Sequence, residues 1–193
     1  MPEKSTRREF LQKTAGAAAA ISLASSKVIG ANERLRIGGI GTGDRGTDRL
    51  EKVKDLGGEI VALADVNGAM LDRCMKRLEL KPKTYVDYHD LLARDDIDAV
   101  VIASPDHWHH DMLIDSIHAG KDAYIEKPLT RTIEEGKDIV KQVKATDRIV
   151  QVGNQRRSGT HWAHARELVE AGKVGEIKFV RTWDCRYRLV DPF

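Results

Sequence analysis

Short apolar runs alternate with amphipathic stretches along the chain from residue 35 onward. The runs are rich in β-branched residues and apolar at consecutive positions, a pattern typical of strands that are covered by helices on both faces. We therefore expect strands over residues 35–40, 60–64, 99–103, 123–125 and 149–152.

The stretches between these runs carry apolar residues at spacings of three and four, which predicts amphipathic helices. In the last of them, Ile139, Val140 and Val143 follow this spacing. Regular alternation of strands and helices predicts an α/β fold, namely a Rossmann-type doubly wound parallel sheet over residues 32–153. The expected helices cover residues 47–56, 69–80, 88–94, 110–119 and 133–146.

The pattern changes after Gly153. A helix is expected over residues 160–171, and the apolar positions in Glu176–Tyr187 predict a strand. A lone strand cannot satisfy its backbone hydrogen bonds. We therefore expect residues 154–193 to be the truncated start of an α+β second domain, and the chain to be the front part of a longer protein.

Composition and charge exclude several classes of protein. The chain has 193 residues, of which 41% are hydrophobic and 32% are charged. This balance excludes a disordered or multi-span membrane protein, and two cysteines are too few for a disulfide framework. The formal net charge is +2, but residues 1–31 hold five basic and two acidic side chains, so the rest of the chain carries −1. A nearly neutral body offers no basic surface, so we expect no nucleic-acid partner.

Residues 1–31 have the organisation of an export signal. The pair Arg7-Arg8 is followed by an uncharged, Ala-rich stretch over residues 14–26. That stretch is too short to span a membrane, and the segment resembles a twin-arginine signal that is cut after Ala24 or Ala31. We expect an exported, periplasmic protein with no other membrane association. The alternative is a frayed amphipathic helix whose two arginines are adjacent by chance.

A glycine-rich turn follows the first expected strand. It reads Gly41-Thr42-Gly43-Asp44-Arg45-Gly46 and runs into a helix, which is the G-x-G-x-x-G pattern in the context that dinucleotide binding requires. Gly41 permits the tight turn, Gly43 lets the pyrophosphate approach the backbone, and Gly46 lets helix and strand pack closely. We expect the phosphates over the helix N-terminus, where free N–H groups favour anions.

Asp65 ends the second expected strand, at the distance from this loop where an acidic side chain hydrogen-bonds the adenosine ribose. A carboxylate there repels a 2′-phosphate, so we expect NAD as the cofactor, with NADP less favoured, although Arg45 offers a contact for a phosphate. The alternative role for Asp65 is to cap the next helix, through Asp65-Val66-Asn67-Gly68. Capping and ribose binding are compatible with each other.

Three further polar segments follow later strands. Together with the glycine loop they resemble the Gfo/Idh/MocA family, which has P-x-x-x-H, E-K-P and G-x-N-R-R-like motifs in this order. All four segments lie at carboxyl ends of parallel strands, the edge where open α/β sheets bind ligands. The three segments are Ser104-Pro105 with His109, then Glu126-Lys127-Pro128, then Gly153-Asn154-Gln155-Arg156-Arg157.

The resemblance implies that Lys127 contacts the substrate hydroxyl and acts with an Asp and a His of the second domain, beyond Phe193. Because Lys127 precedes Pro128, its backbone is held extended, and partial burial would lower the pKa of its ammonium group and suit it to move a proton. The alternative is a surface lysine paired with Glu126. The resemblance also implies cofactor contacts by Ser104, Pro105, His109, Glu126 and Gln155.

Other polar residues leave alternatives open. Arg156 and Arg157 are expected either to clamp an anionic or hydroxyl-rich substrate or to be surface charges. Gln155 stands where the family often has Asn, which is a small departure from the pattern. The histidines within residues 107–110 lack a Cys or carboxylate partner set, so no metal site is expected.

We therefore expect an NAD-dependent oxidoreductase that transfers hydride between nicotinamide and a hydroxyl carbon of a sugar or polyol. The alternatives are a glycoside hydrolase of the same superfamily that recycles its NAD, and a non-catalytic nucleotide-binding module. Because free dinucleotide is scarce outside the cytoplasm, an exported member is expected to hold its cofactor tightly. The sheet of the second domain is the expected surface for a homo-oligomer.

Overall fold

The computed structural model describes residues 34–183, and the expected export signal at residues 1–31 lies outside this range. By their internal contacts, the described residues fall into two units. One unit ends at Val152 and the other begins at Gly153.

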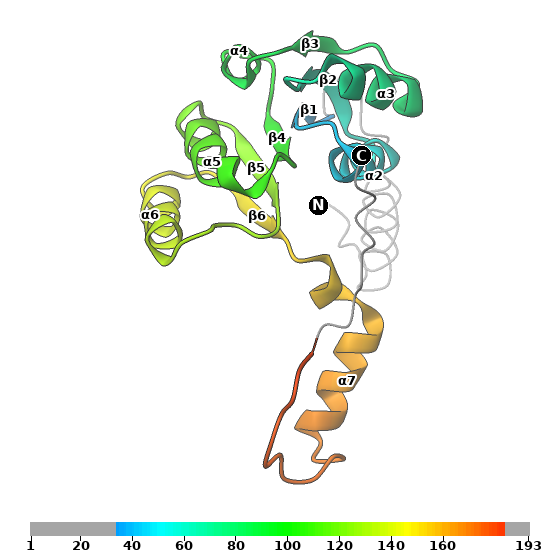
Figure 1. Cartoon of the computed structure of the whole chain (residues 1–193), viewed down its shortest axis with the longest axis vertical. Helices are drawn as coiled ribbons and strands as arrows, with labels where there is room; N and C mark the ends of the chain where they lie inside the picture. Colours follow the sequence, from blue (N-terminus) through cyan, green and yellow to red (C-terminus); the bar gives the residue numbers. More distant parts are fainter. Residues whose placement is uncertain (1–33, 184–193) are drawn as a thin grey trace, which may run out of the picture. The chain divides into compact units, whose positions relative to one another are not determined.

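The first unit is built around a six-stranded sheet (Figure 1). The strand order is β3-β2-β1-β4-β5-β6, and the pairs β1–β2, β1–β4, β2–β3 and β4–β5 are all parallel. The order reverses between β1 and β4, as in doubly wound nucleotide-binding sheets, so the expected Rossmann-type fold is confirmed. The strands are β1 (Arg36–Ile40), β2 (Glu59–Ala64), β3 (Lys83–Tyr85), β4 (Ala99–Ile102), β5 (Asp122–Glu126) and β6 (Val150–Gly153).

Helices connect these strands and cover both faces of the sheet. The one before β5 is preceded by a short 3-10 turn, η2 (Asp106–Trp108). Figure 1 shows α2 and α3 on the opposite side of the sheet from α5 and α6. The helices are α2 (Asp44–Asp55), α3 (Gly68–Leu78), α4 (Tyr88–Leu92), α5 (His109–His118) and α6 (Ile133–Lys144).

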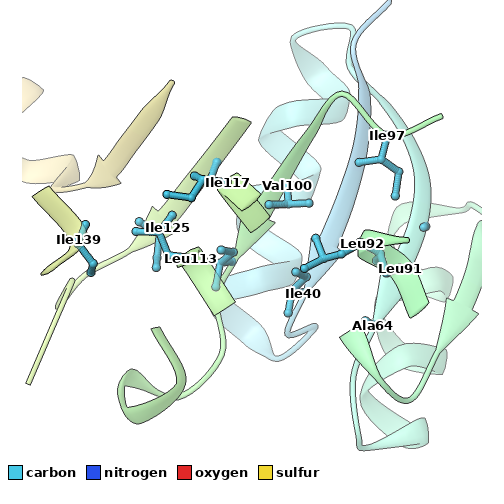
Figure 2. Close-up of a cluster of buried hydrophobic side chains, with 13 residues drawn as sticks. Ile40, Ala64, Leu91, Leu92, Ile97, Val100, Leu113, Ile117, Ile125 and Ile139 are labelled. Carbon is cyan, nitrogen blue, oxygen red and sulfur yellow. The ribbon is translucent and has the colours of Figure 1, made fainter. Parts of the chain in front are cut away.

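Two hydrophobic cores lie on opposite faces of the sheet, because successive residues of a strand point to opposite sides. In β4, Val100 and Ile102 pack with α4, α5 and α6, whereas Val101 packs with α2 and α3. Figure 2 shows the first core, to which Ile40 of β1 and Leu113 of α5 also belong. The parallel strands are therefore buried on both faces, as their continuous apolar runs indicate.

The structure departs from the expected elements of this unit in two places. Strand β3 was not expected, because three residues with an exposed Lys83 at the sheet edge give no apolar run. Helix α2 begins at Asp44 and not at Thr47, because the glycine loop itself supplies the N-cap, Gly43. The other expected strands and helices of the unit are present, with ends that differ by no more than a few residues.

The second unit contains the 3-10 turn η3 (Gln155–Ser158) and helix α7 (Thr160–Glu170). The strand expected over Glu176–Tyr187 is not formed at residues 176–183, the described part of that segment. A strand requires a hydrogen-bonded neighbour, and the described residues supply none for it. Among the helices that the structure describes, none is long and apolar enough to cross a lipid bilayer.

Candidate nucleotide-binding site

Four polar segments of the first unit meet at the carboxyl edge of the sheet. They follow β2, β1, β4 and β5, which are parallel neighbours in that order. The loop after β1 approaches the loop after β4 closely, since a Cβ on Gly41 would lie 2.7 Å from the backbone nitrogen of Ser104. The glycine loop therefore lies where the strand order reverses, which is where such sheets bind ligands.

The three glycines of this loop have distinct surroundings. Gly41 has a φ of +84°, a left-handed conformation that glycine adopts readily. A Cβ on Gly46 would collide with the carbonyl oxygen of Gly41, so glycine is needed for α2 to start this close to β1. A Cβ on Gly43 would meet nothing within 4 Å, so the backbone there faces open space.

These surroundings fit the pyrophosphate of a dinucleotide. Thr47 braces the loop, because its hydroxyl donates to the Thr42 carbonyl (2.9 Å) and its N–H donates to the Gly43 carbonyl (2.9 Å). Gly43 is the N-cap of α2, and no side chain caps this helix. The first turn of α2 therefore leaves N–H groups for an anion that lies over Gly43.

Asp65, directly after β2, is oriented by the loop after β1. Its Oδ2 accepts hydrogen bonds from the Thr42 N–H (2.7 Å) and hydroxyl (3.0 Å), and its Oδ1 accepts one from the Asn67 N–H (2.9 Å). The N-cap of α3 is Asn67, whose side chain accepts from the Ala69 N–H (3.0 Å), so Asp65 does not take the capping role. Since a carboxylate has about four acceptor positions and three are used, Asp65 retains about one position, on Oδ1, for a ribose hydroxyl.

The two charged residues of the glycine loop, Asp44 and Arg45, are both exposed. Asp44 is paired with Arg73 of α3 at 2.5 Å, which ties the start of α2 to the next helix. This pairing engages the Asp44 carboxylate on the protein surface, while the guanidinium of Arg45 reaches solvent.

The carboxylate of Glu126, the last residue of β5, is buried, with 3% of the residue exposed. Its Oε1 lies 3.7 Å from Nε of Arg49 on α2, and its Oε2 accepts the Lys127 N–H at 3.3 Å. A buried carboxylate requires a compensating partner, and Arg49 supplies positive charge. The sequence pattern does not reveal Arg49, because the contact joins two distant segments without a recognisable spacing.

Lys127 is exposed, so the partial burial expected for it is not found in this unit. Its peptide bond to Pro128 is cis. Its N–H is held by Glu126, whereas its side chain reaches solvent. Lys127 therefore combines a fixed main-chain position with an accessible amino group at the carboxyl edge of the sheet.

His109 lies at the start of α5 with 1% of its surface exposed. Its Nδ1 is 2.6 Å from the Pro128 carbonyl oxygen, and its Nε2 is 3.0 Å from the Ser104 carbonyl oxygen. In the same loop, Ser104 is half-buried and Pro105 is exposed. The loop thus brings together three of the residues expected near the cofactor, with His109 at its buried base.

Similarity to known proteins shows the family to which this arrangement belongs. A family model described as an oxidoreductase family with an NAD-binding Rossmann fold matches residues 35–154. The chain belongs to this family, the Gfo/Idh/MocA oxidoreductases. The resemblance in the sequence motifs is thereby confirmed, and so is NAD as the cofactor of the family.

Two curated relatives from Shewanella are each 34% identical to this Gfo/Idh/MocA chain. The match to a glycosyl hydrolase family 109 protein of Shewanella baltica covers 74% of the chain and 33% of the relative. The match to an alpha-N-acetylgalactosaminidase of Shewanella oneidensis covers 75% and 34%. The chain therefore spans about a third of the length of these relatives.

A solved structure resembles the chain in its fold. It is the myo-inositol dehydrogenase of Lactobacillus casei in complex with NAD(H) and myo-inositol. The TM-score is 0.68 and the identity is 29%, over 74% of this chain and 43% of that one. The Rossmann domain of this Gfo/Idh/MocA chain is thus similar to that of an enzyme that binds the dinucleotide.

The expected contacts Gln155, Arg156 and Arg157 belong to the second unit of this Gfo/Idh/MocA chain. Within η3, the Arg157 N–H donates to the Asn154 carbonyl (3.0 Å), and the Arg157 side chain is exposed. The structure gives the local conformation of this turn. The roles of the three residues toward cofactor and substrate stay predictions.

Histidines are common metal ligands, so the surroundings of the described histidines bear on metal binding. The residues that the structure describes contain no group of three His, Cys, Asp or Glu side chains that would hold a metal ion. His110 instead joins two carboxylates, with Nδ1 2.7 Å from Asp111 and Nε2 3.0 Å from Asp138 of α6. Hydrogen bonds to Asp111 and Asp138 raise the pKa of His110, and the bond from His110 lowers the pKa of Asp138. His110 therefore links α5 to α6.

Proposed function

We propose that the chain is the nucleotide-binding part of an oxidoreductase that transfers hydride between NAD and a hydroxyl-bearing carbon of a sugar or polyol. The observation that carries the proposal is the open backbone at Gly43 beside a carboxylate, Asp65, that Thr42 holds in place. The first feature suits a pyrophosphate and the second a ribose. Gly43 follows β1 and Asp65 follows the adjacent strand β2, so the two features are neighbours, as the pyrophosphate and the ribose are in the dinucleotide.

In the proposed reaction, bound NAD supplies the hydride acceptor. The N-terminal amides of α2 hold the phosphates, and Asp65 accepts a hydrogen bond from a ribose hydroxyl. As a neutral amine, Lys127 accepts a hydrogen bond from the reacting hydroxyl of the substrate and takes up its proton to become an ammonium, while the hydride leaves the carbon for NAD. The exposure of Lys127 supports its contact with the substrate hydroxyl, because a substrate can reach its side chain.

A polyol or sugar substrate is proposed from the solved relative, which binds myo-inositol. Arg156 and Arg157 are proposed to hold the hydroxyl-rich or anionic part of that substrate, since guanidinium groups donate several hydrogen bonds in a fixed geometry. The residues expected to complete the site, an Asp and a His, belong to the second domain. A homo-oligomer formed through the sheet of that domain is part of the same proposal.

An exported, periplasmic location is proposed from the pattern of residues 1–31. The paired Arg7 and Arg8 before an uncharged, Ala-rich stretch support it. In that compartment the cofactor is proposed to stay bound and to be recycled within each catalytic cycle. Slow release of NAD from the purified protein would then be expected.

A second candidate function is glycoside hydrolysis in which NAD returns to its starting state. It is favoured by the 34% identity to the family 109 glycosyl hydrolase and to the alpha-N-acetylgalactosaminidase. Both reactions start with removal of hydride from a sugar carbon, and both use the same nucleotide site. They differ in whether reduced nicotinamide accumulates. The intact Glu126-Lys127-Pro128 segment favours the dehydrogenase.

The first experiment asks which dinucleotide the protein holds. The natively purified chain is denatured, any released dinucleotide is identified by mass, and binding of NAD and NADP to emptied protein is measured by calorimetry. We expect NAD, either released in stoichiometric amount or bound on addition in preference to NADP. A folded chain that binds neither dinucleotide would overturn the proposal.

Turnover then separates the candidate functions. The protein is given NAD with myo-inositol and related polyols while nicotinamide absorbance is followed, and separately a chromogenic N-acetylgalactosaminide. Reduction of nicotinamide without glycoside cleavage supports the dehydrogenase. Release of the chromophore without net reduction supports the hydrolase, and NAD binding with neither reaction indicates a nucleotide-binding module.

A further inference from the structure

We propose that His109 is a positioning residue for Lys127, and that it acts by clamping the backbone of two loops and not by touching the cofactor. The clamped loops are those after β4 and β5, at the carboxyl edge of the sheet. This inference rests on the proton-transfer role proposed for Lys127. The structural arrangement behind it, however, is testable without turnover.

The clamp is formed by the two nitrogens of one buried ring. Nδ1 faces the Pro128 carbonyl oxygen at 2.6 Å and Nε2 faces the Ser104 carbonyl oxygen at 3.0 Å. A carbonyl oxygen only accepts hydrogen bonds, so the ring donates in each contact that it makes. A neutral imidazole holds one of the two carbonyls, and an imidazolium holds both. Because His109 itself follows β4, the bond from Nδ1 to the Pro128 carbonyl joins the loop after β5 to that segment, and the bond from Nε2 to the Ser104 carbonyl adds a second contact when the ring is an imidazolium.

The ring is anchored by the helix that carries it. His109 is the first residue of α5, and Leu113 and Ile117 on the same helix are buried in the hydrophobic core under β4 and β5. With 1% of its surface exposed, His109 presents almost no area to a ligand. To contact a dinucleotide, the ring would have to move away from the two carbonyls. To position Lys127, the ring has to remain at them.

Lys127 is held on its other side by Glu126. The Glu126 carboxylate accepts the Lys127 N–H at 3.3 Å and lies 3.7 Å from Nε of Arg49. Arg49 is on α2, the helix that starts at the glycine loop. The main chain around Lys127 is therefore fixed by Glu126 before it and by His109 after it, while the side chain is free to meet a substrate. Proton transfer depends on such placement, because an error of about 1 Å is costly for the rate.

The test compares variants at His109 with a control in the same loop. H109F keeps an aromatic ring and removes both donors, and H109Q keeps one donor group. The control is H107Q, because His107 is exposed. Hydrogen–deuterium exchange of the segment 122–131 is measured by mass spectrometry on the whole chain, and NAD affinity is measured by calorimetry.

We expect H109F to speed exchange in the segment 122–131 about tenfold, the effect of losing one or two hydrogen bonds. Exchange in the glycine loop and the affinity for NAD should change less than about threefold, which is below the effect of one hydrogen bond. H109Q should lie between H109F and the unsubstituted chain, and H107Q should match the unsubstituted chain. If H109F does not fold, the comparison of H109Q with H107Q decides.

Two results would overturn the proposal. Exchange in 122–131 that is unaffected by H109F and H109Q would show that the clamp does not hold the loop. A loss of NAD affinity in a folded His109 variant whose exchange in 122–131 is unchanged would place the ring in contact with the cofactor.

Turnover, once a substrate is found, separates this inference from the proposed function. If K127M leaves kcat unchanged, the proposed role of Lys127 fails whatever the His109 variants do. If K127M abolishes turnover and H109F leaves kcat unchanged, only the positioning role fails. The expected result is that H109F lowers kcat about 10-fold or more, with the KM for NAD nearly constant, as for a misplaced proton-transfer group.

Discussion

Thr42 and Asp65 are joined by two hydrogen bonds, of 2.7 Å from the Thr42 N–H and 3.0 Å from its hydroxyl, to one carboxylate oxygen. The two residues belong to the loops after the adjacent strands β1 and β2. The bonds therefore fix the expected ribose position relative to the expected pyrophosphate position. Because Thr42 is itself buried, this part of the nucleotide site is organised before a cofactor binds, which reduces the cost of binding.

Replacing Asp65 by asparagine tests the ribose contact. The variant D65N keeps an oxygen for Thr42 but loses the charge, so a hydrogen bond from a ribose hydroxyl becomes weaker. We expect the Kd for NAD to rise about 10-fold, which corresponds to about 1.4 kcal/mol. The Kd for NADP should rise less, because repulsion of the 2′-phosphate is removed. Calorimetric titration with both dinucleotides measures the two changes.

Asp72 provides the matched control for Asp65. It is an exposed acidic residue on α3, and D72N removes the same charge from the neighbouring helix. D72N should bind NAD as the unsubstituted chain does. An equal loss of affinity in D72N and D65N would mean that general charge, and not a ribose contact, is responsible.

Gly43 and Gly46 should respond differently to alanine. In G43A the new Cβ meets no protein atom within 4 Å, so the thermal midpoint should stay constant while NAD binding falls at least about 10-fold through a clash with the pyrophosphate. In G46A the Cβ collides with the Gly41 carbonyl oxygen, which destabilises the fold by about 1–3 kcal/mol. Thermal unfolding and NAD titration of both variants provide the measurements. Unchanged NAD affinity in G43A would contradict the pyrophosphate position.

The parts of the site that are local in sequence were predictable. A strand, a glycine turn and a helix follow one another directly, so the pattern Gly41 to Gly46 predicts its own geometry. The capping of α3 was ambiguous, because Asp65 and Asn67 both precede the helix and both residue types cap well. The choice is made by Thr42, which holds the Asp65 carboxylate from another loop.

Contacts between distant segments were not predictable in this way. Nothing in the positions of Arg49 and Glu126 signals that they pair, because the contact depends on how α2 lies across the sheet. The histidine motif predicts a loop near the cofactor, but it does not reveal that the His109 ring turns to two backbone carbonyls. Strand β3 was missed for the same reason, because it is defined by its pairing with β2 and not by its composition.

Asp98 should contribute to the stability of the fold from the amino edge of the sheet, opposite the nucleotide site. Its carboxylate accepts from the Arg36 backbone N–H (2.7 Å), Nε (3.2 Å) and Nη2 (2.9 Å), which joins the start of β1 to the start of β4. We expect D98N to lower the Tm by about 3 °C at neutral pH. The Arg36 guanidinium lowers the pKa of Asp98, so this stability is present above the unfolded-state pKa of about 3.9 and is lost as the pH falls through the folded-state value.

The control for Asp98 is D95N, because Asp95 is an exposed carboxylate nearby in the chain. D95N should leave the Tm unchanged at neutral pH. The difference between D98N and the unsubstituted chain should shrink in scans at acid pH. A difference that stays constant down to about pH 3 would show that the charge of Asp98 does not stabilise the fold.

His110 should make the stability of the first unit depend on pH near neutrality. It lies between Asp111 on its own helix and Asp138 on α6, and these carboxylates raise its pKa, with Asp111 the larger cause. A raised pKa in the folded state contributes stability that is full below the unfolded-state value of about 6.5 and is lost as the pH rises through the folded-state value. We expect H110Q to lower the Tm by about 3 °C more at about pH 5.5 than at about pH 8.5.

The double variant H110Q/D138N measures the share of this pH dependence that comes from Asp138, while Asp111 supplies the larger share. If the ion pair across α5 and α6 is the cause, D138N alone should remove part of the pH-dependent stability, and H110Q should then cost less in the D138N background. The charge of His110 also contributes to lowering the pKa of Glu135 on α6. The variant E135Q therefore measures the smaller contribution of Glu135 to the pH dependence. An effect of H110Q that is the same at both pH values, with or without Asp138, would instead assign the stabilisation to packing of the ring.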